Sequence, residues 1–376
     1  MTGPVRILHL HSSFSLGGKE ARATRLMNLM GARARHYVLS AVPDAMGARD
    51  AVAPDIDVAY PDAAAAPPLH GKPGARRYLA LARYMQGFDL VLSYNWGAMD
   101  GVMAHRMLSP FMELPPLIHH EDGFNEDESV RRNWKRNGFR RLALPTARAL
   151  VVPSEQLQRI ACDEWGASPT LIRNGIDVAA YRRPPTLAIP GLERRPGDVI
   201  VGTAAGLRAV KNLPELVRAV APLPPHVRLV IVGEGPERDG IAKVAAECGM
   251  TDRLLMPGFM AASHRWIGHF DVLALSSRSE QAPIAVIEAM AAAIPVASLA
   301  VGDVAAMVAD ENAPMIVDGR AALTAALRQL VDDAALRQRL GTANAARAAS
   351  LFDEARMVAA YGALYGKALD GRSLFG

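Results

Sequence analysis

The chain has 376 residues, 50% of them hydrophobic, which is too long for one ordinary core and predicts two ordered domains. Its net charge of +4 mildly favours anionic partners such as nucleotides or a membrane surface, but no nucleic-acid recognition motif accompanies that charge. The sequence shows no signal peptide, no apolar run of about 20 residues that could span a bilayer, and no metal or redox motif around its cysteines. We therefore expect a cytoplasmic protein, soluble or membrane-associated, that binds no nucleic acid.

In the first half of the chain, apolar stretches alternate with helical periodicity, which predicts a parallel, doubly wound α/β sheet. Strands are expected at residues 5–11, 37–42, 89–94, 115–119 and 149–154, and helices at 21–30 and 78–85. Ligands of such sheets bind beyond the carboxyl ends of the strands. Gly17 and Gly18 follow the first strand, where they allow close backbone approach and where the next helix offers unpaired N–H groups. A simple tight turn is the alternative interpretation.

Two histidines, His119 and His120, end a short apolar strand, and we expect them to face a cleft between the domains. Strand alternation sends the two rings in opposite directions, and a purely structural role is the alternative for either. The acids that follow match no metal-binding loop, so we interpret them as an exposed loop on the acceptor side. They are Glu121, Asp122, Glu126, Asp127 and Glu128.

A basic run with aromatic residues spans 131–141 and includes Trp134 and Phe139. A solvated helix face is the simplest interpretation. Aromatic side chains among cations also suit a segment that contacts anionic lipid, so the run is a candidate membrane contact.

The second half repeats the alternating pattern after a Pro-rich stretch at 184–196, which we interpret as a linker. Strands are expected at 199–203, 227–232, 254–259 and 271–276. Arg208 and Lys211 follow the first of them. Cations in that place can clamp a diphosphate, the guanidinium as a fork and the ammonium as a point charge.

The helix expected from Ile284 to Ile294 carries a single charged residue, Glu288. A helix without a polar face should be buried nearly all round. Its carboxylate then needs hydrogen bonds, for example from ligand hydroxyls, or a paired arginine. Pro283 suits the first helical position, which leaves Glu280 in the preceding loop. The start of the helix can then bind an anion between the two acids.

The spacing of Glu280 and Glu288 resembles the E-x7-E signature of the retaining glycosyltransferases of family 4, also called glycosyl transferases group 1. Further resemblances follow the family's order along nearly the whole chain. They are the Gly-Gly-x-Glu loop at 17–20, the strand-end histidines at 119–120, the Asn-Gly-Ile-Asp turn at 174–177, Lys211-Asn212, the Gly-x-Gly-Pro-x-Arg loop at 233–238, and the strand and loop at 254–260.

The resemblance implies the GT-B fold, in which two Rossmann-like doubly wound domains face each other across a cleft. The acceptor-side domain would comprise residues 1–180, together with a C-terminal helix at about 355–376 that returns to it. The donor-binding domain would comprise residues 197–354.

The resemblance also implies roles at the reacting centre. His119, or alternatively His120, would contact the donor sugar, Glu280 would hold that sugar, and Glu288 would bind the nucleotide ribose. The family's Gly-Phe-Gly after the first acid is here Gln281-Ala282-Pro283, a departure that affects the local sugar contacts.

Lys211 would stabilise the leaving diphosphate. Arg208 could only be a displaced substitute for the family's arginine, because Gly206 occupies the usual position. The residues expected to bind the donor are Gly17, Gly18, Asn174, Gly206, Gly233, Gly235, Pro236, Gly258, Met260, Gln281, Ala282, Pro283, Ile284 and Glu288.

The function implied is metal-independent, retaining transfer of a hexose from a nucleotide-diphosphate sugar to a glycan or lipid-linked acceptor, without a cofactor. Surface polysaccharide or glycolipid synthesis is the expected setting. A sugar-nucleotide epimerase of the same fold and a nucleotide-sugar-binding module without turnover are the alternatives.

Overall fold

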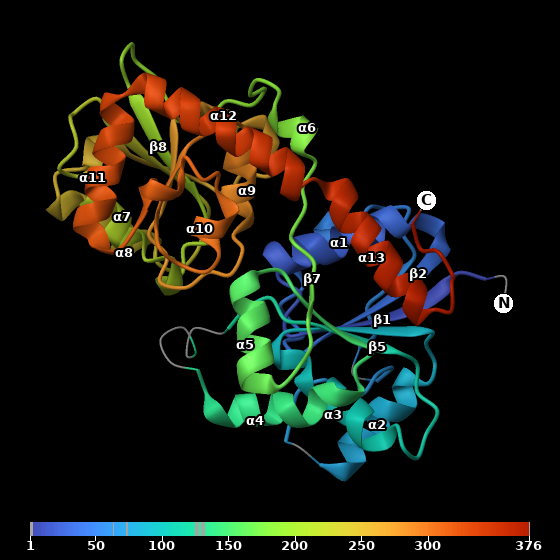
Figure 1. The fold of residues 1–376 in the computed structure, drawn as a ribbon. Helices are drawn as coiled ribbons and strands as arrows, with labels where there is room; N and C mark the ends of the chain where they lie inside the picture. Colours follow the sequence, from blue (N-terminus) through green and yellow to red (C-terminus); the bar gives the residue numbers. More distant parts are fainter. Residues whose placement is uncertain (1–2, 63, 73, 125–127, 129–131, 376) are drawn as a thin grey trace. The chain divides into compact units, whose positions relative to one another are not determined.

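The structure is a computed structural model that describes residues 3–62, 64–72, 74–124, 128 and 132–375. The chain divides into two compact units (Figure 1). Unit 1 comprises Met1–Arg173 and Met357–Gly376, and unit 2 comprises Asn174–Arg356. Each contains a parallel sheet with helices on both faces, so the expected doubly wound α/β architecture is confirmed.

The sheet of unit 1 has seven strands in the order β3-β2-β1-β4-β5-β6-β7, and all its pairs are parallel. The strands are β1 (Val5–His11), β2 (Ala34–Ser40), β3 (Val58–Ala59), β4 (Leu90–Tyr94), β5 (Leu117–His120), β6 (Ala149–Val152) and β7 (Thr170–Leu171). Helices α1 (Gly18–Met30) and α13 (Glu354–Ala368) contribute to the core on one face. The core on the other face includes α2 (Ala75–Met85), α3 (Met99–Leu108), α4 (Trp134–Ala143) and α5 (Glu155–Trp165).

The strand β1 shows how the sequence produces these two cores. Every residue of the strand except Arg6 is buried, as expected for the centre of a parallel sheet. Leu8 and Leu10 join the core under α2–α5, whereas Val5 and Ile7 join the core under α1 and α13. The alternation follows from the two-residue period of a strand.

Towards the carboxyl end of the sheet, the α1/α13 face changes from aliphatic to aromatic and polar. His11 stacks on Tyr94 with ring centroids 4.1 Å apart, and Tyr94 stacks on His120 at 4.7 Å. The phenol of Tyr365 in α13 lies 3.2 Å from Nε2 of His120. Burial lowers the pKa of His9, His11 and His120, so this layer is neutral near physiological pH.

The sheet of unit 2 has six strands in the order β10-β9-β8-β11-β12-β13. They are β8 (Val199–Ala204), β9 (Val227–Val232), β10 (Leu254–Gly258), β11 (Val272–Leu275), β12 (Val296–Leu299) and β13 (Ile316–Val317). The core on one face includes α7 (Leu213–Val220), α8 (Arg238–Glu247) and α11 (Gly319–Asp332). The core on the other face includes α6 (Val178–Tyr181), α9 (Ile284–Ala291), α10 (Val304–Met307) and α12 (Ala334–Leu351).

The Pro-rich stretch at 184–196 is part of unit 2 and not a free linker, which corrects our expectation. Ile189 is buried in the core of that unit, and the backbone N–H groups of Thr186 and Leu187 donate to the carbonyl of Arg265. Proline fixes the backbone but leaves neighbouring apolar side chains free to pack, so proline content alone does not distinguish a linker from a packed arm. Among the described residues, every helix is too short or too polar to cross a membrane.

In both sheets the strand order reverses at one point, between β1 and β4 in unit 1 and between β8 and β11 in unit 2. The crevice beyond the carboxyl ends of the strands at such a reversal is where open α/β sheets bind ligands. In unit 1 the loops after β1 and β4 touch there, because a Cβ on Gly97 would lie 2.6 Å from Cβ of Ser12. In unit 2 the loops after β8 and β11 hold the residues described next.

Candidate functional site

At the strand-order reversal of unit 2, Lys211 and Glu280 form an ion pair. Lys211 ends the turn after β8, and its Nζ donates to Oε1 of Glu280 over 2.5 Å. Ser277, after β11, donates to the same oxygen over 2.7 Å. The side chains of the pair are 17% and 11% exposed, so solvent reaches both charges. The structure thus places two residues predicted for the site in direct contact.

Arg208 lies on the same loop but outside this pair. Its side chain is exposed, and no residue that the structure describes forms an ion pair with it. Its backbone N–H donates to the carbonyl of Gly206, which is itself exposed. The guanidinium is therefore accessible to an anionic ligand without first breaking an ion pair.

The loop before α9 is held by contacts from three directions. Gly302 has a φ of +54°, and a Cβ there would lie 2.5 Å from the carbonyl oxygen of Glu280. The N–H of Asp303 donates to the carbonyl of Gln281, and Nδ2 of Asn174 donates to that of Ala282 over 3.1 Å. The structure therefore joins Asn174 to the predicted anion-binding loop, and Gly302 is a site residue that sequence analysis missed.

Helix α9 begins at Ile284 and not at Pro283, which is a correction. Pro283 is the N-cap, with ψ of +122° in the extended region. The helix is also not buried all round, because Ile284 and Glu288 are only partly buried. The first N–H groups of an α-helix have no partner within it, so this partly accessible turn can bind an anion.

Glu288 is held by two hydroxyl groups, and no arginine among the described residues pairs with it. Its Oε1 accepts from Ser263 over 2.6 Å and from Tyr181 over 2.9 Å. Burial raises the pKa of Glu288, and these two hydrogen bonds act in the opposite direction. Burial, and then the nearby carboxylate, raise the pKa of Tyr181, so the phenol stays protonated as a donor.

The loops after β9 and β10 complete the rim of the site. Gly233 has a φ of +145°, and a Cβ there would lie 1.9 Å from the carbonyl oxygen of Ala205. Gly235 is similar, since its Cβ would lie 2.5 Å from the carbonyl oxygen of Leu207. Gly233 also donates to the carbonyl of Gly258. Only glycine allows this approach, which brings together the predicted residues of three loops, with Pro236 exposed and Met260 partly buried at their edge.

In unit 1, His119 and His120 are both buried, at 0% and 1% exposed. His119 Nδ1 lies 2.9 Å from Oγ of Ser93, and His120 Nδ1 lies 3.2 Å from the Ser93 carbonyl oxygen. The rings point to opposite faces of the sheet, as predicted. Neither presents an accessible nitrogen, so the structure gives both histidines protein partners and not the open position that we expected.

Gly17 and Gly18 are exposed at the start of α1. Gly17 is the N-cap in extended backbone, and Gly18 is already the first helical residue. The following Lys19 donates from Nζ to Oε1 of Glu20. The helix start is therefore accessible at the carboxyl end of β1.

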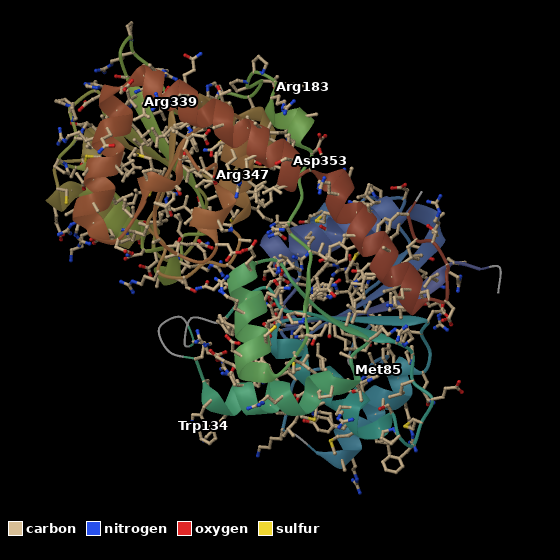
Figure 2. The ribbon with its side chains drawn as sticks, in the orientation of Figure 1. Met85, Trp134, Arg183, Arg339, Arg347 and Asp353 are labelled. Atoms are coloured by element: carbon tan, nitrogen blue, oxygen red, sulfur yellow. The ribbon has the colours of Figure 1, made fainter. Side chains whose placement is uncertain are left out.

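The basic run forms α4 and has two different faces. Trp134 is 76% exposed and Leu142 is 67% exposed, and Figure 2 shows Trp134 projecting from the start of the helix. Lys135 and Arg141 are exposed beside them. Arg140, in contrast, is completely buried, which corrects the simple picture of a solvated face. Arg131 lies outside the described residues.

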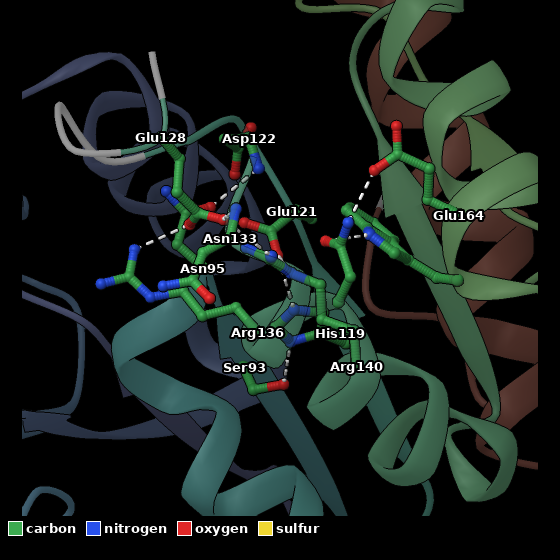
Figure 3. Close-up of polar contacts among 12 residues, drawn as sticks. Ser93, Asn95, His119, Glu121, Asp122, Glu128, Asn133, Arg136, Arg140 and Glu164 are labelled. Carbon is green, nitrogen blue, oxygen red and sulfur yellow. Dashed lines mark hydrogen bonds and ion pairs between the residues drawn. The ribbon is translucent and has the colours of Figure 1, made fainter. Parts of the chain in front are cut away.

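Arg140 and Arg136 form ion pairs with two of the acids that we had placed in an exposed loop, and Figure 3 shows this network. Nε of Arg140 donates to Oε2 of Glu121 over 3.0 Å, and its Nη1 lies 3.6 Å from Oε1 of Glu128. Glu121 and Glu128 are 0% and 3% exposed, so the expectation was wrong for both. The reason is the guanidinium, which lies over the rings of Trp96 and Trp165. Glu126 and Asp127 lie outside the described residues.

Asp122, which follows β5, contacts both α1 and the loop after β4. It forms a two-pronged ion pair with Arg22 of α1 at 2.6 and 2.8 Å, and its N–H donates to Oδ1 of Asn95 after β4. Asn95 has a φ of +58°, an uncommon conformation for a residue other than glycine. Among the described residues, no group of three or more histidine, cysteine or acidic side chains has a metal-binding arrangement.

The region of unit 2 that contains Lys211, Glu280 and Glu288 also matches a known protein family in sequence. Residues 188–347 match the family described as Glycosyl transferases group 1. Residues 188–347 of unit 2 are therefore similar to a group 1 glycosyltransferase domain. This confirms the resemblance to that family, and all the loops described in unit 2 except the one at Asn174 lie inside the matched region.

Relatives of the group 1 domain are named glycosyltransferases. The lipopolysaccharide core biosynthesis glycosyltransferase LpsD of Rhizobium meliloti is 30% identical over 165 residues, which are 43% of this chain and 48% of LpsD. A D-inositol 3-phosphate glycosyltransferase of Streptomyces coelicolor is 32% identical over 300 residues, 70% of this chain and 65% of that protein. The chain therefore spans about half the length of LpsD and less than two thirds of the second relative.

Solved structures with the same fold include HepE of Anabaena in complex with UDP, with a TM-score of 0.77 and 19% identity over 96% of this chain and 100% of HepE. WaaG, a glycosyltransferase involved in lipopolysaccharide biosynthesis, has a TM-score of 0.69 and 15% identity over 96% and 100% of the two chains. Together with the two parallel sheets, these likenesses confirm the GT-B fold class with two Rossmann-like domains.

Proposed function

We propose that the chain transfers a sugar from a nucleotide-diphosphate donor to an acceptor, with retention of the anomeric configuration. The contact of Lys211 with Glu280 beside the start of α9, inside the matched region, is the observation that carries this proposal. An accessible cation and unpaired helical N–H groups suit a diphosphate, and a neighbouring carboxylate suits sugar hydroxyls. HepE, which has the same fold, binds UDP and UDP-glucose, which supports a nucleotide sugar as donor.

The diphosphate leaves as an anion, so its developing charge is what this site would stabilise. Lys211, the exposed Arg208 and the N–H groups at the start of α9 are preorganised for that purpose. The acceptor hydroxyl would attack the anomeric carbon on the face that the diphosphate leaves, and a leaving-group oxygen would take the proton. We propose that these cations replace a metal ion and that no cofactor takes part.

Glu280 would exchange its bond with Lys211 for hydroxyls of the sugar when the donor binds, because the diphosphate then competes for the ammonium group. Glu288 would bind the ribose. We propose that His119 and His120 support the end of β5, since both rings are buried with protein partners.

We propose a glycan or lipid-linked acceptor and a setting in surface polysaccharide or glycolipid synthesis, on the cytoplasmic side of the membrane. The names of LpsD and WaaG support this setting. The exposed face of α4, with Trp134, Lys135, Arg141 and Leu142, offers two apolar anchors and two cations without a carboxylate among them. That combination fits an anionic lipid surface.

The test is nucleotide release by the purified chain over a panel of nucleotide sugars, each with and without glycan and lipid-linked acceptors and with EDTA. We expect acceptor-dependent release, a product with the donor's anomeric configuration, and unchanged turnover in EDTA. Epimerised free nucleotide sugar would identify an epimerase. Tight donor binding without release over the whole acceptor panel would identify a binding module. Binding to vesicles that contain anionic lipid, lost in Trp134→Ala/Leu142→Ala, tests the α4 face.

A further inference from the structure

The Glu288 carboxylate is held on one side only. Both hydroxyl donors, Ser263 and Tyr181, bond to Oε1, and their oxygens lie 2.8 Å from each other. Among the residues that the structure describes, none donates a hydrogen bond to Oε2. Glu288 is partly buried, so the carboxylate has one fixed oxygen and one that can still accept hydrogen bonds.

The three residues come from separate elements of unit 2. Tyr181 ends α6, Ser263 begins a short 3-10 helix at Ser263–Arg265, and Glu288 is in α9. A glutamate side chain on an otherwise apolar helix has several rotamers, and two donors at 2.6 and 2.9 Å restrict it to one of them. The donors also favour the ionised form, which would otherwise be disfavoured by burial.

We propose that Tyr181 and Ser263 are positioning residues that fix Oε1 of Glu288 and so direct Oε2 to the hydroxyls of the nucleotide ribose. This inference rests on the proposed function, because it names the residues that prepare the donor site for its ligand. A ribose presents two neighbouring hydroxyl donors, and an ionised carboxylate oxygen with free lone pairs is their natural acceptor.

A purely structural alternative is a clip in which the three side chains only join α6 to α9. The two roles predict different pH behaviour. If the hydroxyls prepare Glu288 for binding, their removal raises the pKa of its carboxyl, and nucleotide affinity then begins to fall at a higher pH. A clip changes unfolding but leaves the pH profile of binding in place.

The experiment measures UDP and GDP binding by calorimetry between pH 5 and 8 for the wild type, Tyr181→Phe and Ser263→Ala. Ser263→Thr keeps the hydroxyl and should behave as the wild type. Tyr361→Phe is the matched control, because Tyr361 is a buried tyrosine of unit 1 whose hydroxyl has no hydrogen-bond partner among the described residues. The nucleotide phosphate titrates in the same way for all variants, so its effect cancels in the ratio of each variant's affinity to that of the wild type.

We expect each hydroxyl deletion to move the midpoint of the affinity loss upwards by about one pH unit, which weakens binding by up to about tenfold at pH values below both midpoints. Glu288→Gln should lack this step. Midpoints for Tyr181→Phe and Ser263→Ala equal to those of the wild type and Tyr361→Phe would overturn the inference.

A second measurement separates this inference from the proposed function. The carboxyl resonance of Glu288 is followed by NMR in glutamate-labelled protein without ligand and is assigned by its loss in Glu288→Gln. An upward shift of the pKa in Tyr181→Phe that matches the shift of the binding midpoint supports the inference, and no shift of the pKa overturns it, whatever the nucleotide result. Failure of the wild type to bind any nucleotide would instead overturn the proposed donor site.

Discussion

Glu121 in unit 1 and Glu288 in unit 2 are both carboxylates at least partly buried, but their surroundings shift the carboxyl pKa in opposite directions. Glu121 is fully buried against Arg140, and that guanidinium holds the pKa of Glu121 below its usual value in spite of burial. In the part of the chain that the structure describes, the donors to Glu288 are two neutral hydroxyls, and burial raises the pKa of Glu288.

The difference separates a charge that stabilises the fold from a charge that we propose is available to a ligand. In unit 1 the buried carboxylates of Glu121 and Glu128 are balanced by two arginines, the buried Arg140 and the partly buried Arg136. In unit 2, Lys211, Glu280 and Glu288 remain partly accessible, and Glu288 has no charged partner among the described residues. A carboxylate balanced only by hydroxyls retains capacity to accept further hydrogen bonds.

Removing Arg140 should give the largest effect. Arg140→Met leaves the buried carboxylate of Glu121 without its hydrogen-bonded cation, whereas Glu128 keeps Arg136, and we expect a loss of about 3–5 kcal/mol in the free energy of unfolding of unit 1. Urea denaturation measures it. Arg132→Met is the control, because Arg132 pairs with Glu164 at the surface and should contribute less than about 1 kcal/mol. Addition of Glu121→Gln to Arg140→Met should restore part of the loss. Equal losses for Arg132→Met and Arg140→Met would contradict the comparison.

Lys211→Ala should act on rate and not on folding. The charge on the diphosphate grows as the glycosidic bond breaks, so we expect turnover to fall by about 10² to 10³ while donor affinity changes less. Steady-state kinetics at saturating acceptor, with donor affinity from calorimetry, measures the two separately. Arg208→Ala shows whether the exposed guanidinium shares this role or behaves as a surface residue. Wild-type turnover in Lys211→Ala would show that the diphosphate binds elsewhere.

Glu288→Ala should mainly weaken nucleotide binding. Loss of charged hydrogen bonds to the ribose is expected to cost about 1.5–3 kcal/mol, measured by calorimetry at pH 8. Glu121→Ala, its counterpart in unit 1, should affect unfolding far more than binding at the donor site. Unchanged nucleotide affinity in a folded Glu288→Ala protein would refute the ribose contact.

The smallest effects, in the pH dependence of unfolding, should have opposite signs at the two glutamates. Because the folded pKa of Glu121 is lowered, its contribution is present above the reference value of 4.5 and is lost as pH falls. Because the folded pKa of Glu288 is raised, its contribution is greatest below 4.5 and is lost as pH rises. Glu121→Gln should reduce the slope of the free energy of unfolding against pH on the acid side. Glu288→Gln should reduce that slope above pH 4.5, and each change should be at most about 1.4 kcal/mol per pH unit. Flattening on the same side in both would remove the contrast.

The sequence was sufficient for the architecture because the strands carry continuous apolar runs. The expected strands at 5–11 and 227–232 have the bounds of β1 and β9. Lys211 and Glu280 could also be predicted, because each follows a strand end and strand ends at the reversal of a parallel sheet lie together.

The partners of the two glutamates could not be predicted. Tyr181 lies 107 residues from Glu288 in the chain, and Arg140 lies 19 residues from Glu121 within a run that looked like a solvated face. Their pairing depends on how loops of different elements pack, and no local spacing encodes that. Gly302 had a local signal, a glycine after a strand, but its need for a positive φ became visible only beside the carbonyl of Glu280.

Helix α13 gives unit 1 an unusual place in the order of synthesis. Met357, Tyr361 and Tyr365 belong to its core, yet the ribosome translates them after the whole of unit 2. The first 173 residues therefore leave the ribosome with α1 but without α13 on one face of their own sheet. Domains usually fold in the order in which they emerge. Here His120 gains its contacts with Tyr361 and Tyr365 only after unit 2 has been made, so the segment translated second can complete its core first.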